Sequence, residues 1–130
     1  MTAPGVQTRP RVIAVMGSTG SGKSAWVKAY ALRPLPQRIA IWDYSPVPEY
    51  EHVSPYSSLS VCIARMQSER FRVAFQAPTD RKMRERAFGL WCEAVLAAGR
   101  CTVVVEELRY VTQPSRSPDA WAALVMTGRK

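Results

Sequence analysis

The chain has 130 residues, 47% hydrophobic and 22% charged, so it is long enough to bury one core and does not have the composition of a disordered chain. Its formal net charge of +8 at pH 7 favours polyanionic partners. Cys62, Cys92 and Cys101 show no C-x-x-C spacing, so the sequence indicates neither a disulfide framework nor a zinc site. It also lacks a signal peptide and any apolar run of membrane-spanning length, so we expect a cytoplasmic protein without a membrane span.

Predicted strands alternate with predicted helices along the chain. We expect residues 1–10 to form a flexible N-terminus and residues 11–130 to form one domain. The proline- and serine-rich stretch 44–58 predicts a long surface loop. Because parallel strands need long crossover connections, the alternation predicts an α/β fold with a mostly parallel sheet and helices on both faces. The strands are expected at 11–16, 38–43, 71–77 and 101–108, and the helices at 24–32, 59–66, 80–98 and 117–127.

The longest predicted helix has its apolar residues on one face. This face is expected to pack against the sheet, and Gly99 is expected to end the helix. The core positions predicted on this helix are Met83, Ala87, Trp91, Ala94, Val95 and Ala98.

The loop after the first predicted strand carries a phosphate-binding pattern. The sequence GSTGSGKS fits the Walker A pattern G-x-x-x-x-G-K-[ST] and lies between a predicted strand and a predicted helix, as that pattern requires. Its glycines let backbone N–H groups turn toward phosphate oxygens at the positive end of the following helix. We expect Lys23 to reach the β- and γ-phosphates of ATP and the Ser24 hydroxyl to bind Mg²⁺. The predicted cofactor-binding residues are Gly17, Ser18, Thr19, Gly20, Ser21, Gly22, Lys23 and Ser24.

A second polar signal ends the last predicted strand, in the sequence VVVEE. Adjacent carboxylates at a strand end can serve a magnesium ion and an attacking water. We therefore expect Glu106 to be a metal ligand and Glu107 to be the catalytic base, acting with Lys23. The simpler interpretation is that two glutamates end a strand at solvent, and the pattern gains weight from the Walker A loop.

Taken together, the segments GSTGSGKS, IAIWD, VVVEE and TGRK resemble the FtsK/HerA-type P-loop ATPases, in particular the phage DNA-packaging and zonula-occludens-toxin-like branch. The resemblance implies a homo-oligomeric ring in a bacterial or phage-infected cell that hydrolyses ATP to move DNA. It matches Gly17, Gly22, Lys23 and Ser24 to the phosphate loop, and Glu106 and Glu107 to the acidic pair.

This sequence departs from the family pattern at two points. The family usually has Asp where this chain has Glu106. The family also continues after the GRK segment with a strand carrying a polar residue that senses the γ-phosphate, whereas this chain ends at Lys130. Either the chain is a fragment, lacking this sensor strand, or its hydrolysis is impaired.

Two other functions therefore stay open at this point. In a small-molecule or nucleotide kinase, Asp43 would hold the acceptor hydroxyl. In a nucleotide-binding module without turnover, ATP would order the loop and promote assembly or DNA binding.

Other residues have a functional and a simpler interpretation. Trp42 could reach the nucleotide or the sheet edge, and Asp43 could face a ligand or cap a loop. Arg129 could act on the γ-phosphate of a neighbouring subunit, or could be a solvated terminal arginine. The basic segment Asp80–Arg86 could follow a DNA backbone or could be a solvated helix face.

Overall fold

The computed structural model describes residues 11–15, 35–43, 50, 52–106 and 121–123. The described strands are β1 (Arg11–Val15), β2 (Arg38–Asp43), β3 (Ser54–Tyr56), β4 (Phe71–Gln76) and β5 (Thr102–Glu106). The described helices are α2 (Leu59–Arg65), α3 (Arg81–Ala98) and a single turn at 121–123. The predicted helix at 24–32 lies outside the described residues, as do residues 1–10 and most of the predicted helix at 117–127.

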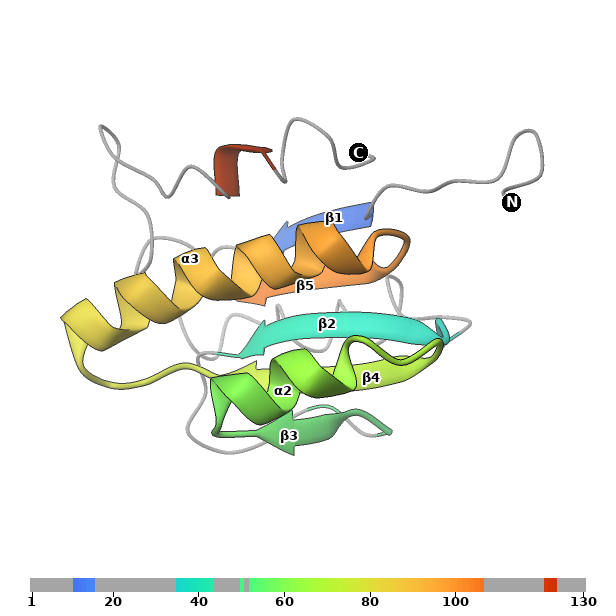
Figure 1. Cartoon of the computed structure of the whole chain (residues 1–130), viewed down its shortest axis with the longest axis horizontal. Helices are drawn as coiled ribbons and strands as arrows, with labels where there is room; N and C mark the ends of the chain where they lie inside the picture. The colour runs from blue at the N-terminus through green and yellow to red at the C-terminus, as the bar shows by residue number, and fades with distance from the viewer. Residues whose placement is uncertain (1–10, 16–34, 44–49, 51, 107–120, 124–130) are drawn as a thin grey trace.

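The described strands form one sheet in the order β1-β5-β2-β4-β3, and every pairing in it is parallel. All the strand arrows therefore point the same way in Figure 1. This arrangement confirms the α/β class and the parallel sheet. The β-branched runs of β2 and β5 are almost fully buried, as expected for strands covered on both faces.

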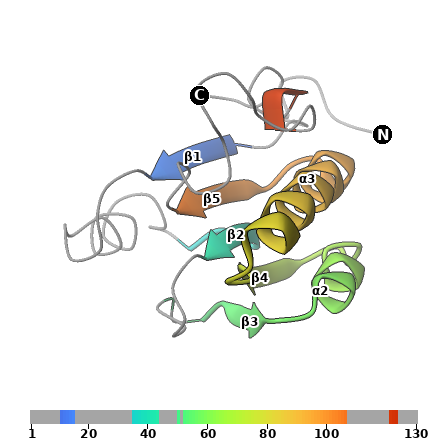
Figure 2. The same ribbon diagram turned by 90° about the vertical axis from the view of Figure 1, so that its left-hand side faces the viewer.

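Both α2 and α3 cover the same face of the sheet, as Figure 2 shows. The core on this face includes Trp121 from the helical turn at 121–123. The opposite face is also buried, with Ile39, Ile41 and Val104 packed among Leu35, Tyr50 and Val53. Helices on this second face are a prediction that falls outside the described residues. No helix in the described part of the chain is long and apolar enough to cross a membrane.

An aromatic cluster joins β2 to α3. The Trp42 side chain has no solvent exposure, and its ring centroid lies 5.0 Å from that of Phe88 and 5.6 Å from that of Trp91, both in edge-on contacts. Phe75 of β4 lies 5.3 Å from the same ring. Trp42 therefore belongs to the core beneath α3 rather than to a ligand site, because alternate residues of a strand face opposite sides of the sheet.

Helix α3 begins and ends where the sequence predicts. The Asp80 side chain accepts a hydrogen bond of 2.9 Å from the Met83 backbone N–H at the N-cap. At the other end, Gly99 has a positive φ of 78°, and its N–H donates to the Val95 carbonyl.

One predicted core position of this helix is wrong. The side chain of Met83 is 62% exposed, while Arg84 is only 8% exposed. Arg84 is accommodated because its Nη1 donates to the Thr79 carbonyl at 3.0 Å, so its apolar stem can be covered while its charge is hydrogen-bonded.

Strand β3 was not expected, since the stretch 44–58 was predicted to be a loop. It is a three-residue edge strand, paired through Pro55 with Ala74 of β4. An edge strand has one side without sheet partners, so a proline is tolerated there. A three-residue stretch that contains serine and proline shows no strand pattern, so the sequence does not predict it.

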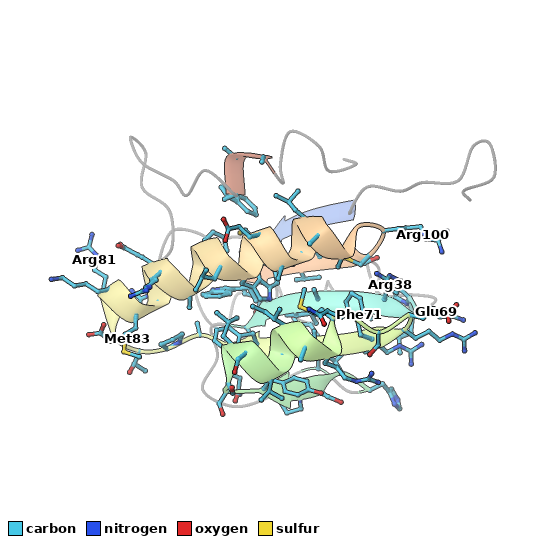
Figure 3. All side chains as sticks on the ribbon, in the orientation of Figure 1. Arg38, Glu69, Phe71, Arg81, Met83 and Arg100 are labelled. Atoms are coloured by element: carbon cyan, nitrogen blue, oxygen red, sulfur yellow. The ribbon has the colours of Figure 1, made fainter. Side chains whose placement is uncertain are left out.

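Arg38 connects two chain turns at the amino end of the sheet. Its guanidinium donates to the carbonyls of Ser68 and Glu69 after α2, and to those of Ala98 and Arg100 around the end of α3. It also lies 4.7 Å above the Phe71 ring, a cation–π contact. Arg38, Glu69, Phe71 and Arg100 lie together at this end of the sheet in Figure 3. A single positive charge thus stabilises carbonyls that no helix bond satisfies.

The three cysteine thiols are free and buried. Burial raises the pKa of Cys62 and of Cys101 to about 12, and burial together with Glu93 raises the pKa of Cys92. At neutral pH these thiols stay protonated, so they behave as small apolar core side chains.

Replacing Arg38 by methionine is expected to destabilise the fold by about 2–3 kcal/mol, because it removes charged hydrogen bonds to four backbone carbonyls but keeps the apolar stem. Urea unfolding monitored by tryptophan fluorescence measures this as a lower midpoint at unchanged slope. The matched control is Arg100→Met, which removes an equal charge from an exposed side chain. Equal losses in the two variants would contradict the role given to Arg38.

Candidate functional site

The carboxyl ends of all the described strands lie at one edge of the sheet, because every pairing is parallel. Ligands of open α/β sheets bind at this edge. At this edge, Val15 of β1 pairs in register with Glu106 of β5. The predicted phosphate loop begins two residues beyond Val15 in the sequence. The two motifs found in the sequence are therefore carried by directly neighbouring strands.

Three polar side chains end neighbouring strands at this edge: Glu106 on β5, Asp43 on β2 and Gln76 on β4. Asp43 pairs in register with Gln76. On its other side, Trp42 pairs with Val105, so the next residues of these two strands, Asp43 and Glu106, lie at the same level. Neighbouring strands are about 4.8 Å apart, so the three backbones are close together. We call these three residues the polar row.

The polar row faces the side of the sheet opposite α2 and α3. Side chains alternate along a strand, and Trp42 and Val105 pack in the core beneath the helices. Their successors Asp43 and Glu106 therefore project to the other face, which they share with Ile41 and Val104. The row is thus separated by the sheet from the described helical layer.

The burial of the polar row sets its chemistry. Asp43 is 1% exposed and Glu106 is 3% exposed, so two carboxyl groups end neighbouring strands largely out of contact with bulk water. Beside them, the buried side-chain amide nitrogen of Gln76 has no hydrogen-bond partner among the described residues. Carboxylate oxygens are the ligands that Mg²⁺ prefers, and an amide N–H can donate to a phosphate oxygen or to a water. The polar row therefore supplies groups of the types that suit a hard cation and an oxygen-rich anion, while no cluster of three or more His, Cys, Asp or Glu placed to hold a metal ion occurs among the described residues.

The sequence-predicted site is described only in part. Glu106 lies where it was expected, at the end of β5, and its role as a metal ligand stays a prediction. The loop residues Gly17–Ser24, the predicted base Glu107 and the terminal Arg129 lie outside the described residues. Asp43 lies at the carboxyl edge of the sheet, and its role as a ligand contact stays a prediction.

The predicted basic segment at the start of α3 does not present all its charges to solvent. Arg84 is buried against the Thr79 carbonyl, as described above. Arg81 forms an exposed ion pair with Glu85 at 3.2 Å. Lys82 and Arg86 are exposed, so they retain charge that a polyanion could reach. Figure 3 shows Arg81 at the end of the sheet opposite to Arg38 and Arg100.

Gln76 was missed by the sequence analysis. In the run FRVAFQ it reads as the polar end of a strand, and only its pairing with Asp43 gives it a place in the site. The signal that could have identified Gln76 is the presence of polar residues at the ends of two predicted strands that lie next to each other in the sheet.

Comparison of the chain with protein-family models, with curated proteins and with solved structures gave no match.

Replacing Glu106 by glutamine is expected to raise the Mg²⁺ concentration needed for half-maximal binding of a fluorescent ATP analogue by at least about tenfold. Even residues that only hydrogen-bond to metal ligands typically contribute about tenfold or more to metal affinity. The measurement is a Mg²⁺ titration of the analogue's fluorescence at fixed protein. Glu93→Gln on α3 removes the same charge from an exposed carboxylate and is the matched control. Indistinguishable titrations of the two variants would refute the metal role of Glu106.

Proposed function

We propose that the chain binds Mg²⁺–ATP at the carboxyl edge of its sheet and hydrolyses it. The observation that carries the proposal is the pairing of β1 with β5, in register at Val15 and Glu106. The strand that leads into the Walker A sequence is thereby the direct neighbour of the strand that ends in the acidic pair. The phosphate-binding motif and the acidic pair would therefore lie next to each other, as a Mg²⁺–ATP site requires.

The roles of the residues follow from their chemistry. Backbone N–H groups of Gly17–Ser24 would bind the phosphates, and the Lys23 ammonium would offset the charge that grows on the β- and γ-phosphates. Glu107, the residue after β5, would orient the attacking water and accept its proton. The donors of the Gln76 amide are suited to a phosphate oxygen or that water.

The donor set near β5 fits a magnesium ion. The Glu106 carboxylate is buried beside Asp43, and Ser24 adds a hydroxyl in the sequence motif. These are hard oxygen ligands, and Mg²⁺ typically takes one or two of them together with the phosphates of a nucleotide. When bound, the ion would neutralise negative charge on the phosphates.

We propose further that ATP turnover is coupled to DNA, in a homo-oligomeric ring. The support is the resemblance to the DNA-packaging and zonula-occludens-toxin-like ATPases, together with the net charge of +8. The resemblance also supports a place in the cytoplasm of a bacterial or phage-infected cell. Turnover that rises on addition of DNA would be its direct sign.

A kinase is the second candidate, and the position of Asp43 favours it. Asp43 is buried at the ligand-binding edge and pairs with Gln76. A carboxylate in this position could hold the hydroxyl of an acceptor. A kinase must exclude water from the γ-phosphate, so in that case ATP would be consumed at a useful rate only with an acceptor present.

Replacing Lys23 by alanine is expected to lower Mg²⁺-dependent ATP hydrolysis by about 10²-fold or more, the typical cost of removing one fixed group that stabilises transition-state charge. The measurement is steady-state phosphate release with and without single- and double-stranded DNA. Lys82→Ala removes an equal charge from an exposed residue of α3 and is the control.

The outcomes separate the candidate functions. DNA-stimulated hydrolysis that Lys23→Ala lacks supports the DNA-coupled ATPase. ATP binding without turnover would leave the nucleotide-binding module, and transfer only in the presence of an acceptor would leave the kinase. Hydrolysis unchanged in Lys23→Ala would contradict the proposed site itself.

A further inference from the structure

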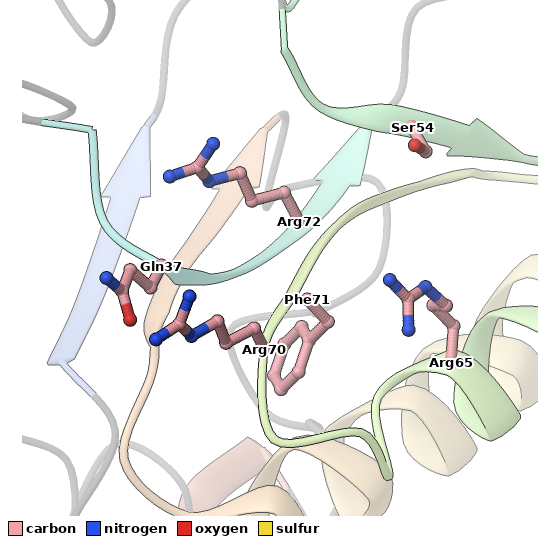
Figure 4. Close-up of a pocket in the computed structure, with 6 residues that line it drawn as sticks. All are labelled: Gln37, Ser54, Arg65, Arg70, Phe71 and Arg72. Carbon is pink, nitrogen blue, oxygen red and sulfur yellow. The ribbon is translucent and has the colours of Figure 1, made fainter.

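A polar cavity lies away from the polar row, near the amino ends of β2 and β4. Its volume is about 320 Å³, and its lining residues are drawn in Figure 4. We call it the arginine pocket. It is lined by Gln37, Ser54, Arg65, Arg70, Phe71 and Arg72.

The charged residues that line the arginine pocket are all positive. Three of its lining residues are arginines and none is acidic. Within the described part of the chain, none of the three forms an ion pair, although an ion pair does form between Arg81 and Glu85 on α3. Three guanidinium groups around one cavity repel one another, and an anion between them would relieve that repulsion.

Two of the guanidinium groups are held in place by hydrogen bonds. Arg72 donates through Nε to the Pro36 carbonyl at 2.8 Å, and Arg65 donates through Nη1 to the Ser68 hydroxyl at 2.8 Å. An arginine has five N–H donors, so each keeps further donors for a ligand. Such anchoring lowers the entropy lost when a ligand binds.

The other polar groups of the pocket are also suited to an anion. Figure 4 shows Arg70 and Arg72 extending toward the side of Gln37, with Ser54 and Arg65 on the other side of Phe71. The Gln37 amide and the Ser54 hydroxyl are both hydrogen-bond donors. Several donors around an uncompensated positive charge match a ligand with many oxygens and more than one negative charge.

We propose that the arginine pocket binds a phosphate group, either in the backbone of a nucleic acid or in a free polyphosphate. Guanidinium groups recognise phosphate through paired N–H donors, which gives the pocket its preference. This site does not rest on the proposed nucleotide site, because it uses other residues at the other end of the strands. It also differs from the basic segment of α3, which lies at the carboxyl edge.

The test compares two double variants that remove the same charge. R65Q/R70Q alters two exposed arginines of the pocket and spares Arg72, whose Nε is bonded to the backbone. K82Q/R86Q alters two exposed cations of α3. Binding of a labelled ten-residue thymidine oligonucleotide is followed by fluorescence anisotropy, in EDTA and again in the Lys23→Ala background. These conditions keep the proposed Mg²⁺–ATP site out of the readout.

We expect R65Q/R70Q to raise the oligonucleotide Kd by about tenfold or more. The slope of log Kd against log salt is expected to fall by about 1.4, because each phosphate contact to a single strand contributes about 0.7 to that slope. The effect of K82Q/R86Q is expected to be clearly smaller. Pyrophosphate binding is measured in parallel by calorimetry. Thermal unfolding checks that the variants fold, and Arg70→Gln alone replaces R65Q/R70Q if that variant does not.

The outcomes identify the source of the phosphate. A selective loss of oligonucleotide binding in R65Q/R70Q supports a nucleic-acid backbone. Equal oligonucleotide binding by the two variants, with pyrophosphate binding lost only in R65Q/R70Q, supports a free polyphosphate. If neither ligand distinguishes the two variants, the pocket is not a phosphate site and the proposal is overturned.

Discussion

The pairing of β5 between β1 and β2 is the constraint on which the rest of the structure depends. β5 is buried on both faces, and its parallel ladders fix the register of both neighbours. Because the side-chain period of a strand is two residues, a slip of one residue would turn Glu106 into the helical core and bring Val105 to the other face. The same register therefore determines the core and the composition of the candidate site.

The two ends of the strands have different chemistry. The carboxyl edge holds the polar row, where buried carboxyl groups end neighbouring strands. The amino end holds arginines, one of which, Arg38, is hydrogen-bonded to the turns that follow α2 and α3. Arg38 is thus committed to the fold, whereas Arg65 and Arg70 are exposed and form no ion pair within the part of the chain that the structure describes. This division supports one role for the carboxyl edge and a separate one for the arginine pocket.

Much of the fold could be predicted from the sequence because its local signals agree with the tertiary structure. The β-branched runs of β2 and β5 are the strands, and Asp80 and Gly99 cap α3 as expected. The failures have physical causes. β3 depends on pairing with β4 rather than on its own composition, and Arg84 is buried because a backbone carbonyl accepts from its charge.

The candidate site was predicted less completely than the fold. Glu106 could be found because an acid at the end of an apolar run is a local signal. Gln76 could not be found in this way, because its place in the site depends on which strands are neighbours, and local sequence does not determine strand order. The role of Trp42 was open for a similar reason: the face toward which a strand residue points is decided by the helices that cover the sheet.

The most direct test of the account is to locate the bound nucleotide by paramagnetic NMR. A Mn²⁺ complex of a non-hydrolysable ATP analogue is added to the ¹⁵N-labelled chain, and the broadening of each amide signal is measured. The account predicts strong broadening at Asp43, Gln76 and Glu106, with the signals of Arg38 and Arg100 at the other end of the strands preserved. Broadening centred on the amino end, or none at the polar row, would contradict a nucleotide site at the carboxyl edge.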